Sequence, residues 1–347
     1  MRTDEMGLSF LSLARAAAVG VLMVAGLAAG APKPAATTRP APKPLGDLPE
    51  RWKAYKLAWA GGNVQRQLLT DRRLVGGILG GAPAEVAVLR GRMIGEYERL
   101  SKLPAVDDYR SGRLASQVAL AWTRLPTGKA LPPVRSARNT RRTCTESCRW
   151  AERAIAHFAA GIQDARWKAH EAFLPGAVAG MMSLIPSRAL WIDRPGQMRD
   201  RLQSLRPRLE KLLTAAGDNQ QQHSQQIETF YRAIEPYGRL EADKQAVGKL
   251  LAGFRTAYNQ RDDKTFVALW PAGHQATRSL KNRTLASRIP PQLWKIDHWE
   301  CVYVGVEKGM ALAYVVSQYR SKAGKLHPPR LQRFPAKRHK KVGWKLN

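Results

Sequence analysis

A histidine and a carboxylate stand two residues apart near the C-terminus, at His298 and Glu300. Residues i and i+2 of a strand share one face, so the histidine could act as a general base with the carboxylate as its partner. The rest of that face is apolar and predicts packing into a core; it carries Trp294, Ile296, Val302 and Val304. The alternative interpretation is a surface pair or a hydrogen-bonded pair at the edge of a sheet.

Two cysteines lie one helical turn apart, at Cys144 and Cys148. This spacing brings them to one helix face, where an oxidising compartment would allow a disulfide, although helix geometry makes that a tight fit. A metal site would need two further ligands, and no histidine stands at a suitable spacing. The sequence therefore predicts structural thiols, free or disulfide-bonded, and no metal site. Cys301 lies in a strand pattern and is expected to be a small buried hydrophobe.

A run of cations and one histidine covers residues 337–341, between two expected strands. Burying unpaired charges would cost several kcal/mol for each, so the run must project into solvent. We expect Lys337, Arg338, Lys340 and Lys341 to form a local contact for anions that weakens with salt. The alternative is a turn that only aids solubility.

The charge of the whole chain fits such a contact. The 347 residues hold 57 Lys or Arg against 27 Asp or Glu, a net charge of +30. Residues 242–347 carry half of this excess, with 21 Lys or Arg against 6 Asp or Glu. Anionic envelope polymers or lipid headgroups are the expected partners. A nucleic-acid partner is not favoured, because the basic segment at 125–143 lacks interleaved aromatic residues.

The N-terminus predicts export. An uninterrupted run of small and apolar residues at 16–29 is too short to span a bilayer and resembles the apolar part of a signal peptide, within a segment covering residues 1–31. The expected location is periplasmic or extracellular, with an uncleaved membrane anchor as the alternative. Residues 32–46 are rich in proline and alanine and predict an extended linker.

The length favours about two domains, and an apolar share of 44% excludes wholesale disorder. Apolar residues recur every three or four positions from 47 to 240, which predicts a helical bundle. One such stripe contains Val86, Leu89, Met93, Tyr97 and Leu100. Residues 125–143 hold three prolines and no acid, and predict a long basic loop that interrupts the bundle.

The pattern changes from residue 242 onward. One amphipathic helix ends near residues 259–263, where Asp262 or Asp263 could cap the next helix. Alternating segments then predict strands at 294–306 and 310–319, followed by a pair at 331–334 and 343–346. The expected fold class is α+β, with a helical bundle followed by a curved antiparallel sheet packed on helices.

The stretch LLAGFRTAYNQRDDKTFVALW, the paired strands and the terminal GWKL carry a family resemblance. Residues 242–347 resemble the nuclear-transport-factor-2-like superfamily, which includes SnoaL-like and ketosteroid-isomerase-like domains. An Asn-x-x-Asp turn ends the first helix in that superfamily, and Asn259 and Asp262 match it. The resemblance implies a cone-shaped sheet with a pocket that could hold a small apolar ligand. The helical region resembles no family.

Enzymes of that superfamily use Asp, Tyr or His side chains that project into the cone. The resemblance makes Tyr258, His274, His298, Glu300 and Tyr303 the candidates, of which Tyr258, His298 and Glu300 are retained. The isomerase signature of a tyrosine with paired aspartates is not visible. We therefore favour an exported, non-catalytic accessory protein that binds a ligand or partner, without a cofactor. A small-molecule enzyme and a weak polyanion binder are the alternatives, and no oligomeric state is predicted.

Overall fold

The computed structural model describes residues 47–104, 106–124, 133–161, 174–214, 220–280, 283–340 and 342–347. The expected signal segment 1–31 and linker 32–46 lie outside the described residues. Among the helices that the structure describes, none combines the length and the apolar character needed to cross a membrane.

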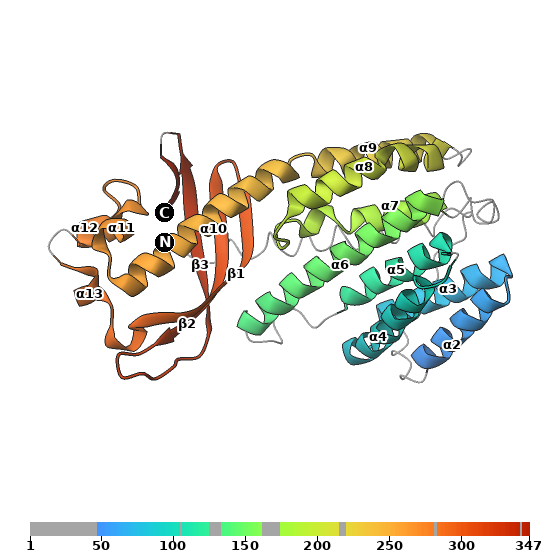
Figure 1. Cartoon of the computed structure of the whole chain (residues 1–347), viewed down its shortest axis with the longest axis horizontal. Coiled ribbons are helices and arrows are strands. Elements are labelled where there is room, and N and C mark those ends of the chain that lie inside the picture. The colour runs from blue at the N-terminus through green and yellow to red at the C-terminus, as the bar shows by residue number, and fades with distance from the viewer. Residues whose placement is uncertain are drawn as a thin grey trace, which may run out of the picture. The chain divides into compact units, whose positions relative to one another are not determined.

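The described chain is α+β, with helices followed by a four-stranded antiparallel sheet, as expected (Figure 1). The helices before the last unit are α2 (Asp47–Ala60), α3 (Val64–Gly80), α4 (Pro83–Leu100), α5 (Asp108–Trp122), α6 (Pro133–Gly161), α7 (Leu174–Ser183), the 3-10 turn η3 (Pro186–Arg188), α8 (Pro195–Thr214) and α9 (Gln220–Ile234). They are followed by α10 (Tyr237–Gln260), α11 (Asp263–Ala268), α12 (Gln275–Ser279), α13 (Leu285–Arg288), the 3-10 turn η5 (Pro291–Leu293), β1 (Lys295–Glu307), β2 (Met310–Arg320), β3 (Arg330–His339) and β4 (Gly343–Leu346).

The chain forms two compact units. Among the described residues, those from 47 to 124 and those within 143–188 and 200–234 belong to the helical unit, and those within 133–142, 189–199 and 235–347 belong to the C-terminal unit. The C-terminal unit is therefore not one continuous segment, and the expected boundary near residue 241 falls within α10.

Local signals in the sequence explain the helices of the first unit. Asn63 and Asp107 accept backbone N–H bonds at the starts of α3 and α5, so each caps its helix. The predicted stripe on α4 is largely confirmed, because Val86, Leu89 and Met93 are buried. No strand occurs among the described residues from 47 to 234.

The prediction of a basic loop at 125–143 is wrong for its second half. Residues 133–143 form the first turns of α6, and residues 125–132 lie outside the described part. Pro133 suits a first helical position because its missing N–H would be unbonded there in any case. Val134 and Ala137 pack against Val302 and Val316 of the sheet. Burial of this short apolar face stabilises a helix that its arginines alone do not suggest.

The sheet has the order β1-β2-β3-β4 with antiparallel neighbours throughout. The first predicted strand pair, β1 with β2, is confirmed. The second differs in register, because β4 pairs with residues 336–339 of β3 and the predicted segment 331–334 pairs with β2 alone. Lys308 and Gly309 join β1 to β2 with φ values of 48° and 79°, the left-handed conformations that a tight hairpin requires.

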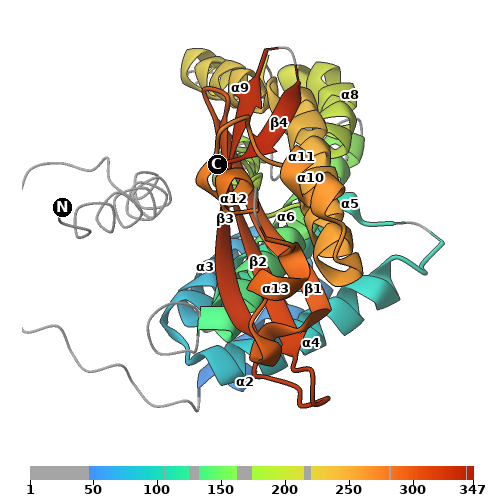
Figure 2. The same ribbon diagram turned by 90° about the vertical axis from the view of Figure 1, so that its left-hand side faces the viewer.

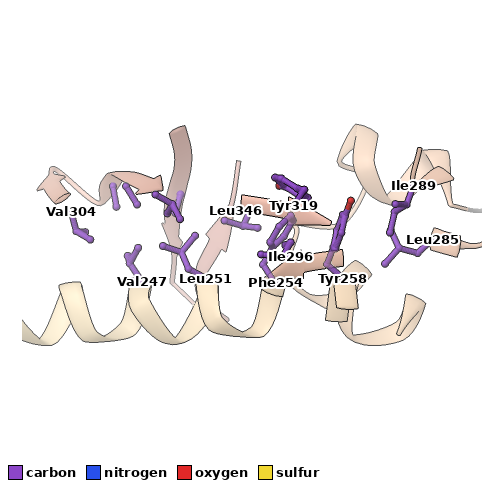
Figure 3. Packing of buried hydrophobic residues seen from close by; sticks show 14 residues of the cluster. Val247, Leu251, Phe254, Tyr258, Leu285, Ile289, Ile296, Val304, Tyr319 and Leu346 are labelled. Atoms are coloured by element: carbon purple, nitrogen blue, oxygen red, sulfur yellow. The ribbon is translucent and has the colours of Figure 1, made fainter. Parts of the chain in front are cut away.

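Helix α10 packs on one face of the sheet, called here the inner face; the opposite face is the outer face. Its side chains Val247, Leu251, Phe254 and Tyr258 project in one row toward Ile296, Val304, Tyr319 and Leu346 (Figure 3). At the end of α10, the Asn259 side chain accepts a bond from the Ile296 N–H at 2.8 Å and donates to its C=O at 3.0 Å. Asp262 caps α11 by accepting the Thr265 N–H at 2.9 Å, as one of the two predicted alternatives.

Candidate functional site

The inner face of the sheet, where the resemblance places a ligand pocket, is packed with aromatic rings. The Phe254 ring lies 5.3 Å from Phe334, 5.5 Å from Phe266 and 5.7 Å from Trp299, measured between ring centroids. Such distances are those of directly packed rings. These side chains hold the helix and the sheet together at the position where a ligand would lie.

Tyr258 belongs to this packing. Its hydroxyl donates a hydrogen bond to the Leu293 carbonyl at 2.5 Å, and burial raises the pKa of the phenol. Both features favour the protonated form, so the hydroxyl is poorly suited to act as a base. Its contacts assign Tyr258 to the positioning of η5 beside α10.

The prediction that His298 and Glu300 face the core is wrong, because β1 contains two register shifts. They fall between Ile296 and His298 and between Cys301 and Tyr303. An extra residue at each bulge exchanges the faces of the strand. The inner face therefore receives Ile296, then Trp299 and Cys301, then Val304. His298 and Glu300 fall on the opposite, outer face.

Arg138 from α6 joins this pair. Its Nε lies 2.7 Å from Glu300 Oε2, and its Nη2 lies 3.1 Å from His298 Nε2. A guanidinium only donates, so the contact requires an Nε2 without a proton. The three side chains are 29% to 48% exposed. The arrangement fastens α6 to β1 in contact with solvent and occupies the lone pair that a general base would use.

A groove lies where α6 begins, beside the connection from β2 to β3. It has a volume of about 570 Å³, and its lining combines apolar side chains with two arginines: Pro133, Val134, Arg135, Arg138, Asn139 and Pro329. Arg135 is exposed and has no acidic partner among the described residues. The groove could therefore hold an apolar group next to a negative charge.

Strand β3 separates the predicted anion contact into two faces. Residues 337–339 belong to the strand, so this part of the cationic run does not lie between two strands as expected, and Lys341 lies outside the described residues. Arg338 lies on the inner-face side of the strand and stays 48% exposed, 3.4 Å from the Asp243 carboxylate, which also accepts a bond from Trp344. Arg338 is thus paired, whereas the exposed Lys337 and Lys340 of the predicted anion contact have no acidic partner among the described residues.

The outer face carries further cations. Arg333 lies four residues before Lys337 on β3, and side chains alternate between the faces of a strand, so both lie on the same face. Its guanidinium lies 5.6 Å from the centre of the Tyr314 ring, which packs against Val302 and Val316. Arg135, Arg333 and Lys337, named here the outer-face cations, are all exposed. None has an acidic partner among the residues that the structure describes.

A buried lysine was missed by sequence reasoning. Lys244 is 9% exposed, and its Nζ donates to the carbonyls of Ala189, Leu190 and Ile192 at 3.3, 2.8 and 2.6 Å. Burial lowers its pKa to about 8. The available signal was its place three residues before Val247, in line with the apolar stripe of α10.

The cysteines are free thiols, so the disulfide alternative for Cys144 and Cys148 is not what the structure shows. Burial raises the pKa of Cys144 to about 11 and that of Cys148 to about 12, which favours inert thiols. Among the described residues, no group of histidine, cysteine and acidic side chains could hold a metal ion.

No family model, curated protein or solved structure matches the chain. The likeness of residues 242–347 to the nuclear-transport-factor-2-like superfamily therefore stays a prediction.

Proposed function

We propose that this is an exported, non-catalytic binding protein whose C-terminal unit binds an anionic partner on the outer face of its sheet. The observation that carries the proposal is the unpaired state of the outer-face cations within the described chain, beside a groove with an apolar lining. Unpaired cations on one rigid face attract anions and orient them.

The contacts on both faces of the sheet support a binding role over an enzymatic one. On the inner face the aromatic side chains pack on one another and Tyr258 is bonded to a carbonyl, and on the outer face His298 accepts a bond from Arg138. Each catalytic candidate is thus engaged in a contact that fixes structure. We draw export from the apolar run at residues 16–29 alone.

Fluorescein-labelled poly-glutamate tests the binding proposal. Anisotropy at low salt should show binding by the full chain that weakens as salt is added. The variant Arg135→Gln/Arg333→Gln/Lys337→Gln should bind at least about tenfold more weakly, because each exposed ion pair contributes up to about 1 kcal/mol.

A matched control removes the same charge elsewhere. Lys53, Arg92 and Lys102 are exposed residues of the helical unit. Their triple change to Gln should leave binding within about twofold of the parent, because contacts on the outer face remain. Equal weakening of both triple variants would mean that only net charge matters, and would overturn the assignment to the outer face.

A further inference from the structure

The two margins of the sheet differ in how their backbone groups are satisfied. The order β1-β2-β3-β4 places β1 at one margin. At the other margin β4 pairs only with residues 336–339 of β3, so residues 330–334 of β3 have a strand partner on one side alone. Figure 2 shows β3 as a long strand and β4 as a short one. An unpaired strand edge is a template for another extended chain.

The β1 margin is covered. Groups from α6, α10 and the segment before α8 bond to its backbone along most of its length: Asn259 to Ile296, Arg255 to Asp297, Arg141 to Cys301 and Leu190 to Val304. Side chains and loops that bond to an edge in this way prevent it from pairing with another strand.

The direction of each backbone group on β3 follows from two hydrogen bonds. Arg338 donates its N–H to Gly309, toward β2, whereas the Pro335 carbonyl accepts from Asn347, away from β2. Backbone groups alternate in direction along a strand. Leu331 and Arg333 have the same parity as Pro335, so their N–H and C=O groups face the open margin. No described residue bonds to these four groups.

The surroundings of this open margin are cationic. Arg330 and Arg333 are exposed, and Arg135 stands at the groove that Pro329 also lines. Residues 325–342 contain no acidic side chain. A second copy of the same edge would bring arginines against arginines, which disfavours pairing between copies of this chain.

We propose that the open edge of β3 binds an extended acidic segment of a partner protein by strand addition. The segment forms main-chain hydrogen bonds with Leu331 and Arg333, and its carboxylates face Arg333 and Arg135. This mode takes affinity from the backbone and specificity from side chains. The inference rests on the proposed function, because it names the partner that the outer face would bind.

Geometry predicts which peptide nitrogens matter. In an antiparallel pair, two residues that exchange hydrogen bonds carry their side chains on the same face. Peptide residues bonded to Leu331 and Arg333 therefore present their side chains on the outer face, beside the cations. In an alternating Glu-Val-Glu-Val-Glu-Val-Glu peptide, the glutamates occupy these positions, and their N–H groups point at β3.

The test compares three fluorescein-labelled forms of that peptide with the full chain. N-methylation of the internal glutamates should weaken binding at least about tenfold, because about two hydrogen bonds of roughly 1 kcal/mol each are lost. The N–H groups of the valines point away from β3, so N-methylation of the valines should leave affinity within about threefold. The reverse pattern would support a parallel strand at the same edge. Equal affinities of the two methylated peptides would overturn strand addition.

A pair of protein variants gives an independent readout. Arg333→Pro and Arg333→Gln both remove the charge, but only proline removes the N–H that faces the open edge. The proline variant should bind the peptide about fivefold more weakly than the glutamine variant. Amide exchange at Leu331 and Arg333 in the unmutated chain should slow with peptide, and unchanged exchange would overturn the proposal even if proline unfolds the sheet.

The outcomes separate the two proposals. Absence of poly-glutamate binding by the unmutated chain would overturn the proposed function, whereas equal weakening in both triple variants would overturn its assignment to the outer face. Binding of both methylated peptides as tightly as the parent would leave an anion-binding outer face and remove strand addition alone.

Discussion

The two units bury their polar groups in opposite ways. In the helical unit, Asp71 is 2% exposed and its carboxylate accepts bonds from Arg113 and Gln117, so a charge lies at the centre of the packing of α3 and α5. In the C-terminal unit, the core around Phe254 is made of apolar and aromatic side chains, and the hydrogen bonds lie at its margins.

This difference has an energetic meaning. The stability of a buried ion pair depends on both partners, because removing one charge leaves the opposite charge uncompensated in an interior that solvates it poorly. An aromatic core loses stability with the volume removed. The hydroxyl of Tyr55 and the amide oxygen of Gln67 are also buried in the helical unit without a hydrogen-bond partner among the described residues, so its interior is sensitive to polar changes. The following variants test this contrast.

The largest effect is expected from Asp71→Ala. Loss of the carboxylate leaves the Arg113 guanidinium buried and unpaired, which should cost about 3–5 kcal/mol in the free energy of unfolding. Urea unfolding followed by circular dichroism measures it. The double variant Asp71→Leu/Arg113→Met should recover most of the loss, since both charges are absent. A double variant as unstable as the single one would contradict a central role for the ion pair.

Lys244 is a buried cation at the margin of the aromatic core, and it gives a pH-dependent effect. Its pKa of about 8 lies below the value of about 10.4 in an unfolded chain. Between these pH values the unfolded state binds more protons, so this group makes the folded state relatively more stable as pH rises. Between pH 7 and 10, the parent should gain roughly 2–3 kcal/mol relative to Lys244→Met. Parallel pH profiles of the two proteins would contradict the shifted pKa.

Asn259→Ala should cost about 2 kcal/mol. The change leaves the N–H and C=O of Ile296 without their side-chain partner at the β1 margin. Asn259→Asp is the control, because it keeps the acceptor for the N–H and loses the donor to the C=O. Its melting temperature should lie between those of the parent and the alanine variant, and a value equal to the parent would show that the amide donor contributes nothing.

The smallest effect is expected from His298→Ala, below about 0.5 kcal/mol. The side chain is 48% exposed, and the Arg138–Glu300 pair remains when it is removed. This reverses the expectation from a core-facing strand position, in which the imidazole would be packed. A loss above about 2 kcal/mol would show that His298 is buried after all.

Particular elements show why part of the fold could be predicted and part of the site could not. The stripe on α4 and the strands near 294–306 and 310–319 follow from periodicity, since the helix and the strand each impose their own spacing on buried residues. The caps at Asp107 and Asp262 act within three residues. The bulges of β1 left no such trace, and they decide which face His298 occupies.

By itself, the sequence determined the α+β order of helices and strands and the hairpin at Lys308-Gly309, because these depend on contacts between near neighbours in the chain. Only the tertiary structure decided that residues 133–143 are helical, that Lys244 is buried against three carbonyls, and that Leu331 and Arg333 face an open edge. Each of these depends on a partner more than 50 residues away or on a strand pairing, and local spacing carries no record of such a partner.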